Sequence, residues 1–202
     1  MKLIFIGPQG SGKGTQAKII AEKLNLKHLS TGDLLRNAQG KLKKEAESYM
    51  NSGKLVPDEL IIKILKEGLS KPEIKDSFIL DGFPRNLEQA EELNKITNID
   101  KIIEISISDE ESIKRLSGRW NCKKCGIAYN VITSPKPKEE GKCDKCQESL
   151  YQRDDDKPGA IKQRLRVYHE DTEPILEKYP SVRINGEQSI KKVTEDILKV
   201  LG

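Results

Sequence analysis

Five short apolar runs, each rich in Ile, Val, Leu or Phe, recur along the chain. They lie at residues 3–6, 27–29, 78–80, 102–107 and 182–184. Runs of this kind, bounded by polar segments and turns, are typical of strands buried on both faces of a parallel sheet. The pattern therefore predicts a five-stranded parallel sheet.

Segments with helical periodicity lie between these runs and after the last one. They cover residues 14–24, 60–69, 88–94, 110–116, 160–178 and 189–201. Pro174 is expected to interrupt the fifth of them, and Ser189 is a candidate N-cap of the last. Strands that alternate with helices indicate an α/β fold in which helices flank the sheet on both faces.

Two segments break the alternation. Residues 30–56 are polar and helical without a strand, and residues 119–156 are rich in Cys, Pro and Lys with little helical period. Both are predicted to be inserts at the edge of one core domain, which then comprises residues 1–29, 57–118 and 157–202.

The charges of the chain nearly cancel, with 36 Lys and Arg against 32 Asp and Glu. Because nucleic-acid-binding proteins are typically more basic, no nucleic-acid partner is expected. The first apolar run ends at Gly7, too soon for a signal peptide or a membrane span. We therefore expect a cytoplasmic protein without a membrane partner, and a monomer, since no exposed apolar stripe indicates an interface.

The sequence GPQGSGKGT at residues 7–15 joins the first strand to the first helix. Glycines let successive N–H groups face one anion, the helix dipole adds partial positive charge, and Lys13 adds a full charge. The pattern predicts a nucleotide phosphate-binding loop; the alternative is a tight turn that binds nothing. Gly14 stands where the general motif has Ser or Thr, and the hydroxyl follows at Thr15, which weakens the case for direct Mg²⁺ ligation by a hydroxyl.

The third apolar run ends in Asp81 and Gly82. A carboxylate at the end of a buried strand is the arrangement by which phosphate-loop enzymes hold Mg²⁺, so Asp81 is a candidate for its second coordination shell. The alternative is an aspartate that caps a turn, because Asp-Gly is a common turn dipeptide.

All four cysteines fall in two CxxC pairs, Cys122 with Cys125 and Cys143 with Cys146. This spacing predicts a four-thiolate zinc site, and four protein ligands make such a zinc structural. A segment with few apolar residues gains folding free energy from the metal that packing cannot supply. The alternative, a zinc ribbon that grips nucleic acid, lacks interleaved stacking aromatics.

Several motifs then occur in one order. They are GPQGSGKGTQ at residues 7–16, STGDLLR at 30–36, GKLVPDEL at 53–60, LDGFPRN at 80–86, GRW at 118–120 and YQRDDD at 151–156, followed by Arg164. With them the chain resembles the adenylate kinase family over essentially its whole length, in the form whose lid carries a metal. The resemblance implies a P-loop kinase fold with an AMP-binding insert at residues 30–56 and a zinc-bound lid at residues 119–156.

The resemblance also implies the ligands, which are ATP, AMP and ADP with Mg²⁺. The residues implied to bind AMP are Thr31, Arg36, Lys54, Leu55, Val56, Gly82, Phe83, Pro84, Arg85, Gln89, Arg153 and Arg164. Those implied to bind ATP are Gly10, Ser11, Gly12, Lys13, Gly14, Thr15, Arg119, Ala128, Tyr129 and Gln188. Among them, Lys13, Arg85, Arg119, Arg153 and Arg164 are the expected catalytic residues.

The implied reaction is the reversible transfer of a phosphoryl group, ATP + AMP = 2 ADP. An anionic acceptor needs no strong base, so catalysis rests on alignment, positive charge and closure of the lid, for which adenylate kinases are a known example. Three points stay open. Arg115 is either a further phosphate ligand or part of a surface ion pair, and the acidic residues 154–156 either hold the arginines, orient metal-bound water or form an ion pair at a hinge. The sequence does not decide whether the peptide bond before Pro84 is cis.

Two other functions are considered. The chain could be a kinase of the same fold that acts on UMP, CMP or GMP, although Thr31 and Gln89 favour AMP. It could also be a nucleotide-dependent binding module with a zinc ribbon, although two distinct nucleotide sites in one chain argue against it.

Overall fold

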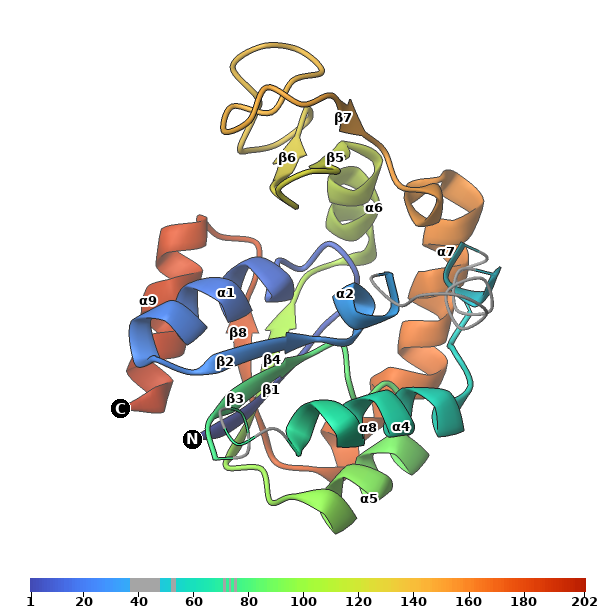
Figure 1. Cartoon of the computed structure of the whole chain (residues 1–202), viewed down its shortest axis with the longest axis vertical. Helices are drawn as coiled ribbons and strands as arrows, with labels where there is room; N and C mark the ends of the chain where they lie inside the picture. The colour runs from blue at the N-terminus through green and yellow to red at the C-terminus, as the bar shows by residue number, and fades with distance from the viewer. Residues whose placement is uncertain (37–47, 52–53, 71, 73, 75) are drawn as a thin grey trace.

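The computed structural model describes residues 1–36, 48–51, 54–70, 72, 74 and 76–202. Its centre is a five-stranded parallel sheet with the strand order β2-β3-β1-β4-β8 (Figure 1). The strands are β1 (Lys2–Ile6), β2 (Lys27–Ser30), β3 (Phe78–Asp81), β4 (Lys101–Ser106) and β8 (Ser181–Asn185). The five predicted strands are confirmed, and β2 includes Ser30, which the predicted division had assigned to the first insert.

Alternate residues of the central strand face opposite sides of the sheet. Leu3 and Phe5 pack in a cluster with α1 (Lys13–Leu24) and α9 (Ile190–Leu201). Ile4 and Ile6 belong to a second cluster with α4 (Asp58–Leu69) and α5 (Leu87–Ile96). Because helices bury both faces of the sheet, the central strand β1 needs no polar side, which explains its continuous apolar sequence from Leu3 to Ile6.

The remaining helices are α2 (Thr31–Arg36), α6 (Asp109–Ser117), α7 (Pro158–Val167) and α8 (Pro174–Lys178). Between the last two lies a π-helical turn, η2 (Tyr168–Thr172), in which the N–H of Glu173 donates to the carbonyl of Tyr168 at 2.8 Å. Because Pro174 has no N–H to continue the α-helical ladder, the predicted interruption occurs here.

The two predicted inserts differ in how much of them is described. In residues 30–56, positions 37–47 and 52–53 lie outside the described residues, and the described part contains α2 and the helical residues 48–51. The second insert contains a three-stranded antiparallel sheet formed by β5 (Arg119–Cys122), β6 (Ala128–Asn130) and β7 (Leu150–Tyr151). This small sheet, here called the lid sheet, stands apart from the core beyond the end of α6 (Figure 1).

Two side-chain amides attach the lid sheet to the last turn of α6. Asn130 Nδ2 donates to the carbonyl of Arg115 at 2.8 Å, and Gln152 Nε2 donates to the carbonyl of Ser117 at 3.0 Å. The last carbonyls of a helix lack partners within the helix, so these amides satisfy them from the lid sheet.

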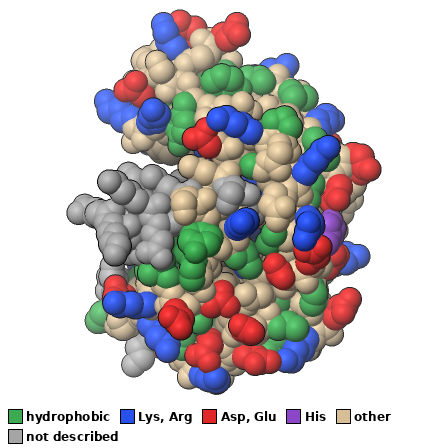
Figure 2. Space-filling model, turned by 90° about the vertical axis from the view of Figure 1, so that its right-hand side faces the viewer, with side chains coloured by type: hydrophobic (Ala, Val, Ile, Leu, Met, Phe, Trp, Pro, Cys, Tyr) green, Lys and Arg blue, Asp and Glu red, His purple; other side chains and the backbone are tan. Residues whose placement is uncertain are grey.

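The described surface is mixed in charge. Acidic and basic side chains lie interspersed over the face drawn in Figure 2, as the near cancellation of charge in the sequence implies. None of the helices in the described ranges is both long and apolar enough to cross a membrane.

The core packing predicts a large effect at Ile103. This residue is fully buried in β4, and its neighbours lie on β1 and β8. Ile103→Ala should lower the free energy of unfolding by about 3 kcal/mol, because it removes buried methyl groups and leaves a cavity. Denaturant unfolding measures this change. Ile113→Ala is the control, because Ile113 is 40% exposed on α6, and its effect should stay below about 0.5 kcal/mol. Equal losses in the two variants would contradict the described core.

Candidate active site

The predicted phosphate loop joins β1 to α1. Gly10 and Gly12 have φ of 86° and 91°, a conformation that residues with a side chain rarely adopt. Gly12 caps α1 without a side-chain hydrogen bond, so the N–H groups of the first turn remain available to an anion. The Ser11 hydroxyl is buried and has no hydrogen-bond partner among the described residues. A phosphate oxygen would provide the missing partner.

Lys13 lies at the start of α1 in a concentration of positive charge. Burial lowers the pKa of Lys13 from 10.5 to about 8, and the carboxylate of Asp81 opposes this shift. Three guanidinium groups add to it by repulsion, those of Arg85, Arg164 and Arg119. The cations predicted from four separate segments are therefore close enough to act on one another.

Asp81 faces the phosphate loop from the end of β3. A Cβ atom added to Gly14 would lie 2.9 Å from Asp81 Oδ2, so only glycine leaves room for this carboxylate beside α1. The departure from the general motif at Gly14 thus has a structural reason. The carboxylate also contacts His28 Nε2 at 3.3 Å, and its place opposite the loop fits the predicted position in the second coordination shell of Mg²⁺.

A pocket opens beside the phosphate loop and gathers most of the residues predicted for AMP. Those that line it are Thr31, Lys54, Leu55, Val56, Gly82, Arg85, Gln89, Arg153 and Arg164. Gln9 of the phosphate loop lines the same pocket, so the two predicted phosphate sites adjoin. Phe83 and Pro84 do not line it; both are buried, and the peptide bond between them is cis. The Arg36 side chain lies outside the described part of the chain.

Hydrogen bonds fix the loop that carries Arg85. Arg85 Nε donates to the carbonyl of Gly82 at 2.8 Å, and the Thr31 hydroxyl donates to the same carbonyl at 2.9 Å. The N–H of Arg85 donates to Gln89 Oε1 at 2.7 Å. From the π-helical turn, the Thr172 hydroxyl donates to the carbonyl of Arg85 at 2.7 Å. The backbone of Arg85 is thereby held from two helices.

Two buried carboxylates hold three arginines at the same place. Arg119 pairs with Asp156 through two hydrogen bonds, one of them 2.8 Å from Nε to Oδ2. Arg153 pairs with Asp155 in the same manner. Arg164 Nη1 lies 3.1 Å from Asp155 Oδ2 and 3.3 Å from Asp156 Oδ1. Although burial alone would raise the pKa of Asp155, Arg164 and Arg153 hold it at about 2.

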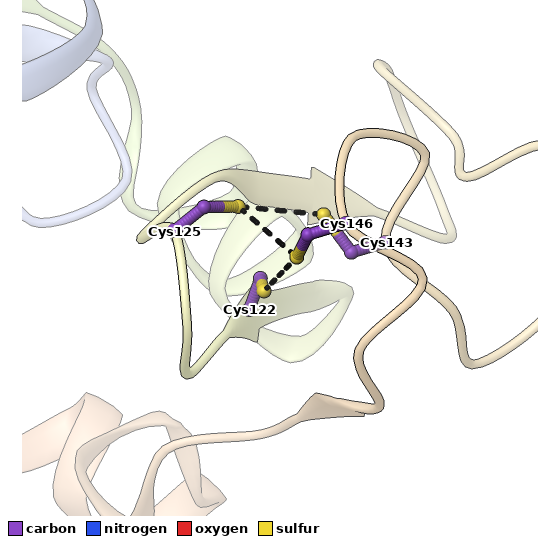
Figure 3. A group of neighbouring side chains, drawn as sticks. All are labelled: Cys122, Cys125, Cys143 and Cys146. Carbon is purple, nitrogen blue, oxygen red and sulfur yellow. Dashed lines mark hydrogen bonds between the residues drawn. The ribbon is translucent and has the colours of Figure 1, made fainter.

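The four cysteines converge from two loops of the lid sheet, with their thiols pointing toward one another (Figure 3). The Sγ atoms of Cys122 and Cys146 are 3.4 Å apart, as are those of Cys125 and Cys143, and all four lie within 4.8 Å of one another. A disulfide would bring two sulfurs to about 2.05 Å. A tetrahedral zinc with Zn–S bonds of about 2.3 Å separates its sulfurs by roughly 3.8 Å. The donor set and its spacing therefore fit a metal and not a disulfide.

The chain is similar to known proteins over its full length. The family model described as adenylate kinase matches residues 5–184. The adenylate kinase of Methanothrix thermoacetophila is 49% identical over 213 residues, which cover 100% of this chain and 98% of the relative. The adenylate kinases of Archaeoglobus fulgidus and Caldicellulosiruptor bescii are 46% and 44% identical, over 100% of this chain and 98% and 99% of the relatives. The chain belongs to the adenylate kinase family.

Family membership confirms the resemblance and the fold, whereas the roles of single residues stay predictions. On the ATP side, Ala128 is exposed at the start of β6, but the Tyr129 side chain is buried inside the lid sheet. Its hydroxyl lies at the cysteines and does not face the phosphate loop. Gln188 Nε2 donates to the carbonyl of Asn185 at 2.9 Å and to Asp196 Oδ2 at 3.1 Å, so its amide is engaged by its own loop and by α9.

The sequence left the roles of Arg115 and of residues 154–156 of this adenylate kinase undecided. Arg115 is more than a surface ion pair with Glu111, since it also donates to the carbonyl of Gly186 at 3.0 Å and to that of Gly10 at 3.4 Å. It thereby bridges the phosphate loop and the loop after β8. Asp154 pairs with exposed Lys157, whereas the two carboxylates after it hold the arginines. No local signal in the sequence separates these roles, because the contacts that distinguish them, those of Arg115 with Gly10 and Gly186 and of Asp156 with Arg119, join residues distant in the chain.

The charge of Lys13 predicts a pH dependence of ATP binding. The protonated form attracts phosphate, and with a pKa of about 8 it is lost as pH rises from 7 to 9. ATP affinity should therefore fall over this range, and binding at pH 8.5 should take up protons, because bound phosphate restores the lysine charge. Calorimetry in two buffers of different ionisation enthalpy measures both quantities. In Lys13→Arg the charge persists, so its weaker affinity should be independent of pH. A wild-type affinity that stays constant from pH 7 to 9.5 would contradict the shifted pKa.

Proposed function

We propose that this adenylate kinase transfers a phosphoryl group reversibly between ATP and AMP, giving two ADP, with Mg²⁺ bound to ATP. The observation that carries this proposal is the pocket lined jointly by Gln9 of the phosphate loop and by Arg85 and Arg164. It adjoins the triphosphate site, as an in-line transfer between two phosphates requires.

The chain's own residues would supply alignment and positive charge. Lys13 and the first-turn N–H groups of α1 would hold the phosphates of ATP, and Arg85 would hold that of AMP. Arg119, Arg153 and Arg164 would neutralise charge on the group in transfer, which is the main catalytic demand because the acceptor is already anionic. When bound, Mg²⁺ neutralises phosphate oxygens, and Asp81 would hold it through water. Zinc, if bound by the four cysteines, would stabilise the lid sheet and take no part in the chemistry.

The orientation of Gln89 favours AMP over GMP and UMP. Its Oε1 accepts from the N–H of Arg85, and its Nε2 donates to Asp58 Oδ1, both at 2.7 Å. A flipped amide would place its NH₂ against that N–H and its carbonyl against the carboxylate. In this fixed orientation, the second lone pair of Gln89 Oε1 can accept from an amino group, and the second N–H of Nε2 can donate to a ring nitrogen. Adenine, and the smaller base cytosine, present an amino group beside such a ring nitrogen. Guanine and uracil present the reverse pattern.

Residues 30–56 and 119–156 would close over the nucleotides as separate units, as lids do in adenylate kinases. We further propose that the protein is cytoplasmic and monomeric. Among the described residues, the exposed large apolar side chains form no long stripe, since only Val131 and Ile132 are adjacent in the chain. They are Met1, Ile113, Val131, Ile132 and Ile190.

The function is tested by measuring ADP formation from Mg·ATP with AMP, CMP, UMP and GMP supplied separately. AMP should be the preferred acceptor, followed by CMP. Arg85→Ala and Arg164→Ala should each lower kcat by at least about 100-fold, because each removes positive charge that is stronger in a dry site than in water. Arg166→Ala is the matched control, since this arginine of the same helix is exposed and pairs with Glu170; its kcat should not change. Turnover only with another monophosphate would overturn the Gln89 argument, and no turnover with any would overturn the proposed activity.

The hydroxyl of Thr172 predicts a selective effect on the AMP side. Thr172→Val keeps the shape of the side chain but leaves the Arg85 carbonyl without its donor, at a cost of about 1 kcal/mol. The KM for AMP should rise about fivefold while the KM for ATP stays unchanged. Thr172→Ser should restore the wild-type value. Equal increases in both KM values would show that the hydroxyl supports the fold in general and not the Arg85 loop.

A further inference from the structure

The two cysteine loops of the lid sheet are built alike. In the first, the N–H of Gly126 donates to the carbonyl of Cys122 at 3.0 Å; in the second, the N–H of Gln147 donates to that of Cys143 at 2.8 Å. Gly126 and Gln147 share a left-handed conformation, with φ of 69° and 58°. The loops are therefore two copies of one turn, facing each other across the sulfur cluster.

The backbone donates to the sulfurs in the same pattern in both loops. The donors are the N–H groups of Lys124, Cys125 and Ile127 in the first loop and of Lys145, Cys146 and Glu148 in the second. A zinc ion with four thiolates carries two net negative charges, and N–H groups directed at the sulfurs spread that charge. Within the described residues, the two loops thus supply the same number of backbone donors from corresponding positions.

Tyr129 breaks this equivalence. Its hydroxyl lies 3.5 Å from the Sγ of Cys143 and accepts a hydrogen bond from the N–H of Asp144 at 2.8 Å. Since that N–H can only donate, the proton of the hydroxyl is free to point at the sulfur. The corresponding position for the second loop, also seven residues after its first cysteine, is Leu150, which has no donor.

The environment of Tyr129 offers its hydroxyl few other hydrogen-bond acceptors among the described residues. The side chain is 5% exposed and packs in one cluster with Cys122, Cys143 and Leu150. A buried hydroxyl needs an acceptor, and within this cluster the described acceptor for its proton is the sulfur of Cys143.

We propose that Tyr129 supports the metal site: its hydroxyl donates a hydrogen bond to the Cys143 thiolate and so strengthens retention of the metal. The inference rests on the four-thiolate zinc site proposed above. It assigns the Tyr129 side chain to the lid interior, in place of the ATP contact that the family resemblance implies. Partners of metal ligands typically contribute 10- to 100-fold to metal affinity.

The experiment compares Tyr129→Phe with Tyr151→Phe in the full-length, zinc-loaded protein. Tyr151 is a second tyrosine of the lid sheet, whose described contact is with the Lys123 side chain, at 5.2 Å from Nζ to the ring centre. Zinc affinity is measured by competition with a coloured chelator. Tyr129→Phe should weaken it about 10- to 100-fold, whereas Tyr151→Phe should match the wild type. The KM for ATP should be unchanged in both variants.

Two further measurements separate a hydrogen bond to sulfur from simple packing. In the cobalt-substituted protein, Tyr129→Phe should shift the thiolate-to-metal absorption band. In excess zinc, the thermal midpoint of Tyr129→Phe should stay below that of the wild type, because weaker binding stabilises the folded state less even when every site is filled. In the metal-free protein the two midpoints should agree; a difference that persists without metal would overturn the proposal in favour of packing.

The remaining outcomes are also decisive. Unchanged zinc affinity together with a raised KM for ATP would return Tyr129 to the ATP site. A wild-type protein that retains no zinc would overturn the metal site itself, and this failure is distinct from that of the kinase function, which the ADP assay tests separately.

Discussion

Repulsion among cations is the constraint on which the rest of this structure depends. In the proposed reaction, Arg119, Arg153 and Arg164 surround one phosphoryl group, yet in the absence of phosphate their charges oppose one another. Asp155 and Asp156 resolve this conflict because each pairs with more than one guanidinium group, and the Asp156 side chain is 0% exposed. Charges buried in this manner are stable only while their partners remain, so the cluster holds its geometry before any nucleotide arrives.

The parallel sheet explains why residues so distant in sequence meet. In a parallel sheet all carboxyl ends lie at one edge, where ligand sites form. The phosphate loop follows β1, Thr31 follows β2, and Asp81 ends β3, with Gly82 directly after it. Gly186 follows β8 and reaches the phosphate loop through the guanidinium of Arg115. The nucleotide sites are thus a consequence of strand direction as much as of individual motifs.

Features with a local sequence signature were predictable, and features made by distant partners were not. The phosphate loop and the paired cysteines carry their spacing in consecutive residues, and the strands carry theirs in apolar runs, so all were found from the sequence. The glycine at position 14 had no local explanation, because the carboxylate that requires it comes from β3. The position of the Tyr129 hydroxyl likewise depends on a cysteine that lies across the lid sheet from it. In each case the missing information was a pairing in space and not a residue type.

The proposed metal site and the arginines proposed to be catalytic are linked by short strands. β5 has four residues, beginning with Arg119 and ending with Cys122. β7 pairs with it next to that cysteine, and the chain then reaches Arg153 two residues later. A sheet this small cannot fix its own register through a core, since the buried members of its apolar cluster are only two cysteines, Tyr129 and Leu150. A metal that joins the two loops would therefore set the register of β5 and β7, and with it the positions of both arginines relative to Asp155 and Asp156. In this way a structural ion that takes no part in phosphoryl transfer would still determine where the two arginines lie relative to the phosphoryl group that is transferred.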